Sequence, residues 1–129
     1  MVRLAVDAMG GDFAPQEIVR GAVAALQARA DLKVLMVGRR EQIAEILGGL
    51  DYPAERLDLI HADEIIHGSD SPGQAIHRKR ESSMVTALRL VRSGDADAVL
   101  SAGNTGALMA GALLYLGRLP GIRRPALLA

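Results

Sequence analysis

Apolar and polar positions follow two different spacings along the chain. Short runs rich in Val, Leu, Ile, Ala and Met predict buried strands at residues 3–8, 32–37, 57–60 and 95–100. Between these runs the apolar residues return every three or four positions, which is the spacing of a helix with one buried face. This spacing predicts helices that begin near Pro15, at residues 41–47, after Ser71 and at residues 107–116. A further strand is expected to start at Ala126.

The order of these elements indicates the class of fold. Strands that alternate with helices, joined by crossovers of a dozen or more residues, call for a parallel sheet with right-handed connections. The 129 residues suffice for one domain or part of one, and half of them are hydrophobic. With two Tyr, one Phe and no Trp the core must be aliphatic, which suits helices packed on a parallel sheet. We therefore predict an α/β protein.

The turn after the last of the predicted internal strands carries the strongest candidate chemistry. Its sequence, SAGNTG at residues 101–106, supplies two glycines for close backbone approach and three polar side chains, those of Ser101, Asn104 and Thr105. The free N–H groups of the following helix point into the same space, so an anion, most simply a phosphate, is a natural ligand. A helix cap in an ordinary strand-to-helix turn explains the same residues equally well on spacing alone.

A second glycine turn follows the first predicted strand, at residues 10–11 between Asp7 and Asp12. It is similar to a phosphate-binding turn but lacks both the GxGxxG and the GK[ST] patterns. Pro15 at the first helical position leaves Ala14 as a poor cap, so Asp12, water or a bound anion must satisfy the N–H groups of that helix. For Asp7 we expect a structural role, in which its carboxylate accepts N–H bonds from the turn.

The helix that begins after Ser71 cannot continue unbroken. The sequence SPGQ at residues 71–74 is a strong helix start with a serine cap, but the run HRKRESS at residues 77–83 is polar throughout and interrupts the buried stripe. We predict a break near Ser82, with Ser82 or Ser83 capping a second helix. The basic residues 78–80 beside two hydroxyls are a candidate anion site, and a solvated basic surface is the alternative.

Composition excludes several classes of function. The net charge is zero, which gives no global attraction to nucleic acid, and the absence of Cys excludes disulfides, thiolate nucleophiles and zinc–thiolate sites. The chain enters a strand almost at once, without the pattern of a secretory leader. Its longest apolar stretch, residues 107–116, is shorter than the roughly 20 residues that cross a bilayer. We therefore expect a soluble, cytoplasmic segment.

One polar loop invites a metal interpretation. Residues 61–70 (HADEIIHGSD) contain two His and three carboxylates. Their spacing does not match HExxH, and a mixed polar loop between a strand and a helix is far commoner than a metal site. We therefore predict no metal site here.

Three motifs resemble those of one enzyme family. They are VDAMGGD at residues 6–12, RKRESSM at residues 78–84 and SAGNTGAL at residues 101–108. Together, in this order and spacing, they resemble the bacterial phosphate acyltransferases of phospholipid synthesis, the PlsX family. Members of that family are more than twice this length, so the resemblance implies that residues 1–129 are the N-terminal portion of one α/β domain, inactive by itself. It would leave an exposed sheet edge and an uncovered apolar helix at residues 107–116.

The resemblance also implies a fold, a reaction and partners. The fold would be a three-layer Rossmann-like parallel sheet with flanking helices, of the isocitrate and isopropylmalate dehydrogenase type. The reaction would transfer a fatty acyl group from acyl carrier protein to inorganic phosphate, giving an acyl phosphate for phosphatidic acid synthesis. No cofactor is implied. The protein would be a cytoplasmic homodimer, associated peripherally with the inner face of the plasma membrane through parts absent from this chain.

Site residues follow from the same motifs by resemblance. Asn104 and Lys79 are expected to be catalytic. No histidine lies in a matching motif, so none is expected to act as a general base. Phosphate and substrate binding would fall to Gly10, Gly11, Asp12, Ser82, Ser83, Gly103, Thr105 and Gly106.

Two alternatives of other kinds stay open. One is a different enzyme on the same sheet, such as a phosphotransacetylase or a nucleotide-dependent dehydrogenase, since fold alone does not choose the chemistry. The other is a non-catalytic module that binds a phosphate-bearing metabolite.

Overall fold

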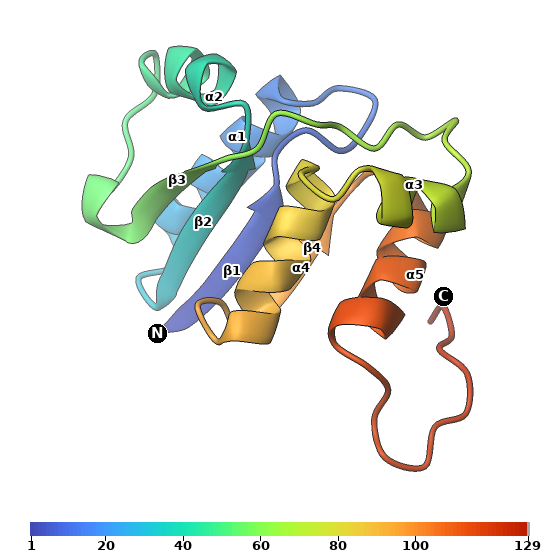
Figure 1. The fold of residues 1–129 in the computed structure, drawn as a ribbon. Coiled ribbons are helices and arrows are strands. Elements are labelled where there is room, and N and C mark those ends of the chain that lie inside the picture. The colour runs from blue at the N-terminus through green and yellow to red at the C-terminus, as the bar shows by residue number, and fades with distance from the viewer. Residues whose placement is uncertain (129) are drawn as a thin grey trace.

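A parallel sheet with the strand order β3-β2-β1-β4 forms the middle layer of the molecule (Figure 1). The computed structural model describes residues 1–128. The elements in chain order are β1 Val2–Asp7, α1 Gln16–Ala28, β2 Leu32–Gly38, α2 Arg40–Leu47, a short 3-10 helix Ala54–Arg56, β3 Leu57–His61, α3 Pro72–Arg78, α4 Ser83–Ser93, β4 Ala98–Ser101 and α5 Thr105–Tyr115.

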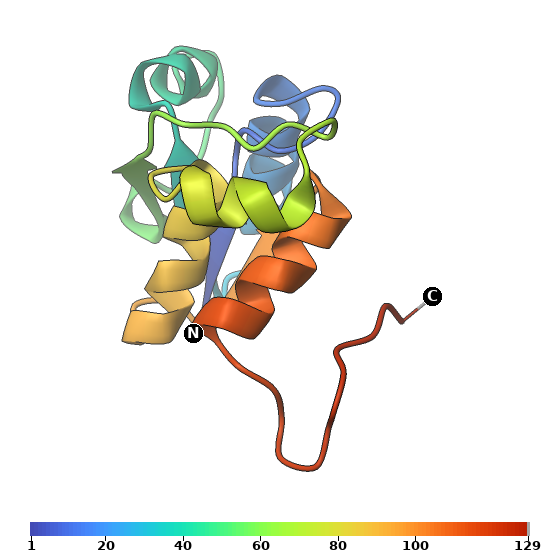
Figure 2. The same ribbon diagram turned by 45° about the vertical axis from the view of Figure 1, so that its right-hand side comes forward.

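Helices cover both faces of the sheet, which makes three layers. Alternate residues of β1 point to opposite faces. Leu4 and Val6 pack with the buried residues of α1 and α2, whereas Ala5 packs with Ala87 of α4. Figure 2 shows α3, α4 and α5 grouped together on the second face. The α/β class and the three-layer parallel sheet expected from the sequence are confirmed.

The aliphatic core follows the predicted helical spacing. Val19, Val23 and Leu26 of α1 are buried against the sheet together with Ile43 of α2. A second cluster joins α3, α4 and α5, and in it Gly111 of α5 allows close packing. A Cβ atom on this glycine would lie 2.6 Å from Leu88 and 2.9 Å from Ile76. The close helix contacts on this face therefore depend on a glycine.

The predicted break between α3 and α4 is confirmed. α3 ends at Arg78 and α4 begins at Ser83, and Ser82 Oγ accepts a bond from Val85 N at 3.2 Å as the helix cap. The predicted start of α3 is confirmed, with Ser71 as the cap residue and Pro72 as the first helical residue, although the Ser71 side chain makes no capping hydrogen bond. Its backbone carbonyl instead accepts the N–H of Ala75.

The start of α1 also differs from the prediction. Pro15 is the cap residue rather than the first helical residue. The carbonyl of Phe13 accepts the N–H of Glu17, and the carbonyl of Gly11 accepts the N–H of Ala14. A backbone carbonyl of the preceding turn thus accepts an N–H group at the start of α1, and the Asp12 side chain does not cap the helix.

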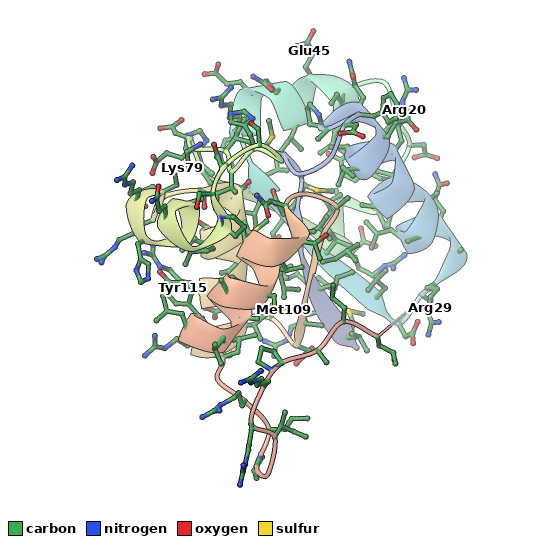
Figure 3. All side chains as sticks on the ribbon, turned by 90° about the vertical axis from the view of Figure 1, so that its right-hand side faces the viewer. Arg20, Arg29, Glu45, Lys79, Met109 and Tyr115 are labelled. Carbon is green, nitrogen blue, oxygen red and sulfur yellow. The ribbon has the colours of Figure 1, made fainter. Side chains whose placement is uncertain are left out.

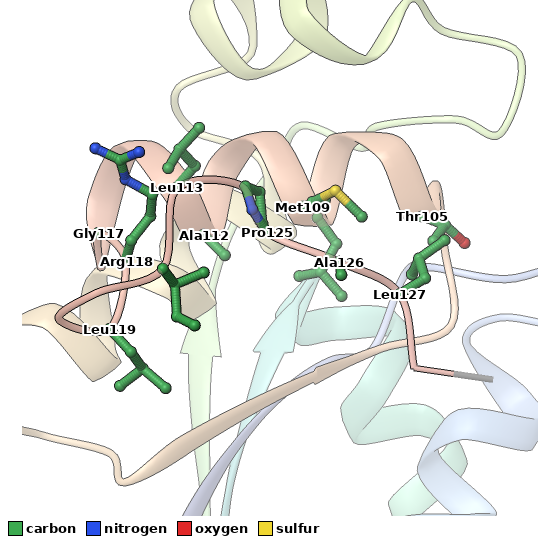
Figure 4. A pocket seen from close by; sticks show the side chains of 12 residues that line it. Thr105, Met109, Ala112, Leu113, Gly117, Arg118, Leu119, Pro125, Ala126 and Leu127 are labelled. Carbon is green, nitrogen blue, oxygen red and sulfur yellow. The ribbon is translucent and has the colours of Figure 1, made fainter.

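The chain after α5 has no regular structure over residues 117–128. The strand expected from Ala126 is absent from residues 126–128, so within the described chain β4 has no neighbour on its outer side. The apolar helix expected to lie uncovered does so at Leu113, Leu114 and Leu116, which are exposed. A cavity of about 420 Å³ lies between α5 and residues 117–127, lined mainly by aliphatic side chains such as Met109 (Figure 4).

Candidate functional site

The order of the strands reverses between β1 and β4, which makes this the topological switch point of the sheet. Ligands of open parallel sheets bind outside the carboxyl ends of the strands at such a point. Asp7, the last residue of β1, pairs in register with Ser101, the last residue of β4. The two glycine turns singled out from the sequence therefore leave the sheet side by side.

The two turns are packed backbone against backbone. A Cβ atom on Gly10 would lie 2.6 Å from Asp7 Oδ2, 2.8 Å from Ser101 Oγ and 3.0 Å from Gly103 N. A Cβ atom on Gly103 would lie 3.2 Å from the Cα of Gly10. Gly11 has φ +118°, a backbone conformation that other residues rarely adopt. Three of the four predicted binding glycines thus have a steric or conformational reason in the structure.

A buried carboxylate lies directly below these turns. Asp7 is 2% exposed. Its Oδ1 accepts bonds from Ser83 Oγ at 2.5 Å and from Met9 N at 3.1 Å, and its Oδ2 accepts one from Ser101 Oγ at 2.7 Å. The structural role expected for Asp7 is confirmed by the bond from Met9. The two serine partners are new, because nothing in the local sequence places residues so distant beside Asp7.

Ser82 and Ser83 are buried at the start of α4, and both hydroxyl groups form hydrogen bonds within the protein. Ser82 caps the helix, and Ser83 donates its hydroxyl proton to Asp7. The positive end of the α4 dipole therefore faces the Asp7 carboxylate, which occupies the place of an anion there.

Lys79 lies at the end of α3, on the side of the sheet that α4 and α5 cover (Figure 3). Its Nζ donates to Asp70 Oδ2 at 2.6 Å and to the carbonyl of Ile65 at 2.8 Å. The hydrogen bond from Lys79 holds the pKa of the Asp70 carboxyl below its ordinary value of 3.8, and the N–H of His67 adds to this effect. The lysine thus fastens the loop between β3 and α3.

Asn104 fastens the same loop from the other side. Its Oδ1 accepts the N–H of Ala107 at 3.0 Å, as a helix cap. Its Nδ2 donates to the carbonyl of His67 at 3.2 Å and to that of Asp70 at 2.9 Å. Both N–H groups of the amide are therefore occupied by protein acceptors. The capping interpretation of the turn is confirmed for Asn104, and its expected catalytic role stays a prediction.

The remaining predicted residues lie apart from one another. Thr105 is exposed at the start of α5, and Asp12 is exposed in the turn before α1. Gly106 is a packing residue, since a Cβ atom there would lie 2.8 Å from the ring of Pro72 in α3. Within residues 1–128, the N–H groups of Gly10, Gly11 and Thr105 donate to no protein acceptor, whereas that of Gly103 donates to Ser101 Oγ at 3.2 Å.

Neither a metal-binding cluster nor a membrane-spanning helix is found among residues 1–128. No group of three or more His, Cys, Asp or Glu side chains in residues 1–128 is placed to hold a metal ion. In the same range, none of the helices has both the length and the apolar character needed to span a membrane.

Comparison with known proteins places the chain in a family. Residues 2–129 match the model of a family described as fatty acid synthesis protein. The chain belongs to this family. It is 51% identical over 126 residues to a phosphate acyltransferase of Caldanaerobacter subterraneus, 49% identical over 126 residues to one of Thermoanaerobacter pseudethanolicus, and 50% identical over 127 residues to one of Desulfitobacterium hafniense. Each match covers 98% of this chain but 37% of the relative, so the chain spans about a third of the length of these relatives.

A solved structure supports the fold at lower identity. The EutD phosphotransacetylase from Staphylococcus aureus superimposes with a TM-score of 0.61 at 21% identity, over 95% of this chain and 40% of that one. This likeness concerns the fold alone.

Proposed function

We propose that this chain is part of a phosphate acyltransferase, which moves a fatty acyl group from acyl carrier protein to inorganic phosphate. The proposal rests chiefly on the 51% identity to a protein named phosphate acyltransferase, along nearly the whole chain. The fatty acid synthesis family supports an acyl substrate. The two joined glycine turns at the switch point supply a fitting place for the phosphate.

The chemistry needs no covalent nucleophile from the protein. A phosphate oxygen attacks the thioester carbonyl, a tetrahedral oxyanion forms, and the C–S bond breaks as the carrier thiol leaves and takes up a proton. The protein must hold the phosphate, aim one oxygen and stabilise the oxyanion. A chain without Cys is compatible with this route.

We place the phosphate between the turn at residues 10–11 and the start of α5. The N–H groups of Gly10, Gly11 and Thr105 lack protein acceptors there, and main-chain N–H groups at a helix start suit an anion. Asn104 and Lys79 would join the reaction only by exchanging partners in the loop between β3 and α3 for substrate. The proposed set of binding residues also includes Asp12, Ser82, Ser83, Gly103 and Gly106.

Acyl carrier protein is the proposed donor, and the proposed docking surface is basic. Arg78 and Arg80 are exposed beside α3, close in the chain to Lys79. A positive patch would attract an acidic carrier protein. By family resemblance the complete protein is proposed to be a cytoplasmic homodimer, attached peripherally to the inner face of the plasma membrane.

The test uses the complete gene product that contains this chain. It is incubated with a long-chain acyl carrier protein thioester, with and without phosphate, and hydroxylamine traps acyl phosphate as hydroxamate. We expect hydroxamate only when phosphate is present. A folded protein that forms none would contradict the proposal, and turnover with coenzyme A thioesters alone would instead indicate a phosphotransacetylase.

A further inference from the structure

Asp7 is an unusual residue for the interior of this protein. Among residues 1–128 it is the only buried side chain of an acidic or basic type, and no Lys, Arg or His there forms an ion pair with it. Burial of a carboxylate without a cation is costly unless hydrogen bonds replace its hydration. The bonds from Ser83, Ser101 and Met9, with the α4 dipole, supply that replacement.

The partners of Asp7 come from three separate parts of the fold. Ser83 opens α4 and lies 76 positions along the chain, and Ser101 ends β4 and lies 94 positions along the chain. Met9 belongs to the turn that holds Gly10 and Gly11. One carboxylate therefore joins a strand end, a helix start and a glycine turn.

The direction of these bonds decides what the serines can do. An ionised carboxylate offers acceptors only, so the hydroxyls of Ser83 and Ser101 are the donors. Each serine has a single hydroxyl proton, and in each serine this proton is used in the hydrogen bond to Asp7. Neither hydroxyl can then donate to a phosphate.

The Ser101 hydroxyl links Asp7 to the second glycine turn, at residues 101–106. It accepts the N–H of Gly103 at 3.2 Å, while Met9 N binds Asp7 directly. The Asp7 carboxylate therefore fixes the first glycine turn through one hydrogen bond, from Met9 N, and the second through two, by way of the Ser101 hydroxyl. The N–H groups of Gly10, Gly11 and Thr105, which belong to these turns or follow them directly, form no hydrogen bond with a protein acceptor in the described chain.

We infer that Asp7 is a positioning residue of the phosphate site: it holds the two glycine turns in register and makes main-chain N–H groups, not the Ser83 and Ser101 hydroxyls, the donors to phosphate. The inference rests on the proposed function for its effect on the reaction. It differs from a purely structural role because it predicts a change in phosphate use beyond any loss of stability.

The main test is Asp7→Asn in the complete gene product. The variant keeps the shape of the side chain but replaces one acceptor oxygen by an N–H donor, so one serine or one turn loses its bond. We expect kcat/KM for phosphate to fall by about tenfold or more, with the KM for acyl carrier protein thioester within about twofold of the wild type.

Leu26→Ala is the matched control, because Leu26 lies on the buried side of α1, on the other face of the sheet. It should lower Tm without changing the phosphate dependence by more than about twofold. If Asp7→Asn and Leu26→Ala change phosphate use alike at similar Tm, Asp7 has no positioning role. If Asp7→Asn does not fold, Ser101→Ala takes its place, since it breaks only the step from Asp7 to Gly103, and the same two outcomes decide.

Amide hydrogen exchange gives an answer that does not depend on turnover. In Asp7→Asn or Ser101→Ala, the segment 101–104 should exchange about tenfold faster than in the wild type, and in Asp7→Asn the segment 8–12 should do so as well. In Leu26→Ala, the exchange rates of these segments relative to the rest of the protein should be the same as in the wild type. Unchanged exchange would overturn the inference. A wild-type protein without hydroxamate formation would overturn the proposed function instead, and the exchange result would still decide the role of Asp7.

Discussion

The Asp7 cluster and the Lys79–Asn104 cluster lie on neighbouring parts of one site and use their polar groups differently. Asp7 is 2% exposed, has no cation partner in the described chain and is held by hydroxyls and an N–H group. Lys79 keeps 30% of its side chain exposed, in an ion pair with Asp70. The buried cluster can change only by disrupting the fold, whereas the half-exposed pair can exchange partners at low cost. We infer that the first shapes the site and the second is free to respond to substrate.

The largest effect is expected at the contact between the two glycine turns. Gly10→Ala would put a Cβ atom 2.6 Å from Asp7 Oδ2 and 2.8 Å from Ser101 Oγ, so the turns must separate. We expect turnover of the complete enzyme to fall by about a hundredfold, because displacements of this size misplace reacting groups. Gly21→Ala is the control. It meets nothing within 4 Å in α1 and should raise stability by about 0.5–1 kcal/mol with normal turnover. Near-normal turnover of Gly10→Ala would refute the shaping role of the turns.

Asn104 tests whether the second cluster takes part in the reaction. Asn104→Ala removes both the cap of α5 and the two donors to the loop between β3 and α3. We expect turnover to fall by about tenfold or more if the amide stabilises the transition state. Asn104→Asp keeps the capping oxygen and loses the donors, so it separates the two functions. If the aspartate variant restores full turnover, the amide donors have no catalytic role.

A smaller effect is expected at the exposed basic residues. Replacing Arg78 and Arg80 together by Glu should raise the KM for acyl carrier protein thioester several-fold, and the increase should shrink at high salt because exposed charges are screened. The KM for phosphate should change little. Arg20→Glu is the control for charge, since Arg20 lies on α1 across the sheet (Figure 3). An unchanged KM for the carrier substrate would remove this surface from the docking proposal.

The smallest effect concerns pH. Because Lys79 lowers the folded pKa of Asp70, the unfolded state binds the proton more readily, and the stabilisation is present above the ordinary pKa of 3.8. It is lost as the pH falls through the lowered pKa. The Tm of Asp70→Asn should therefore lie below that of the wild type at pH 7, and the difference should close as the pH drops below about 3.8. A Tm difference that stays constant down to acid pH would contradict this.

The fold was largely predictable because its causes are local. The alternation of aliphatic runs with helical spacing indicated every strand and α-helix of the described chain, but not the 3-10 helix Ala54–Arg56. The polar run at residues 77–83 located the break between α3 and α4, after which Ser82 caps α4. The errors concern details decided by backbone geometry, such as Pro15, which caps α1 instead of beginning it. The prediction of a strand from Ala126 was wrong for residues 126–128, because local sequence does not show whether a strand has a neighbour to pair with.

The candidate site was predictable in its residues but not in their connections. The glycines and Asn104 were found because turn chemistry is local, and Asn104 does cap α5. The hydrogen bond between Ser83 and Asp7 was not predicted, because the two residues lie 76 positions apart and meet only in the folded protein. Lys79 was expected to lie in an anion site of the basic residues 78–80, but the fold brings the Asp70 carboxylate to its amine at 2.6 Å.

The most direct test of the account is phosphate binding to the complete gene product labelled with ¹⁵N-glycine. The spectrum is recorded as inorganic phosphate is added, and the Gly10→Ala variant assigns the signal of Gly10. We predict saturable shifts of the Gly10 and Gly11 N–H signals, while the signal of Gly21 in α1 stays constant. Saturable phosphate binding that leaves Gly10 and Gly11 unmoved would contradict the placement of the phosphate between the two turns.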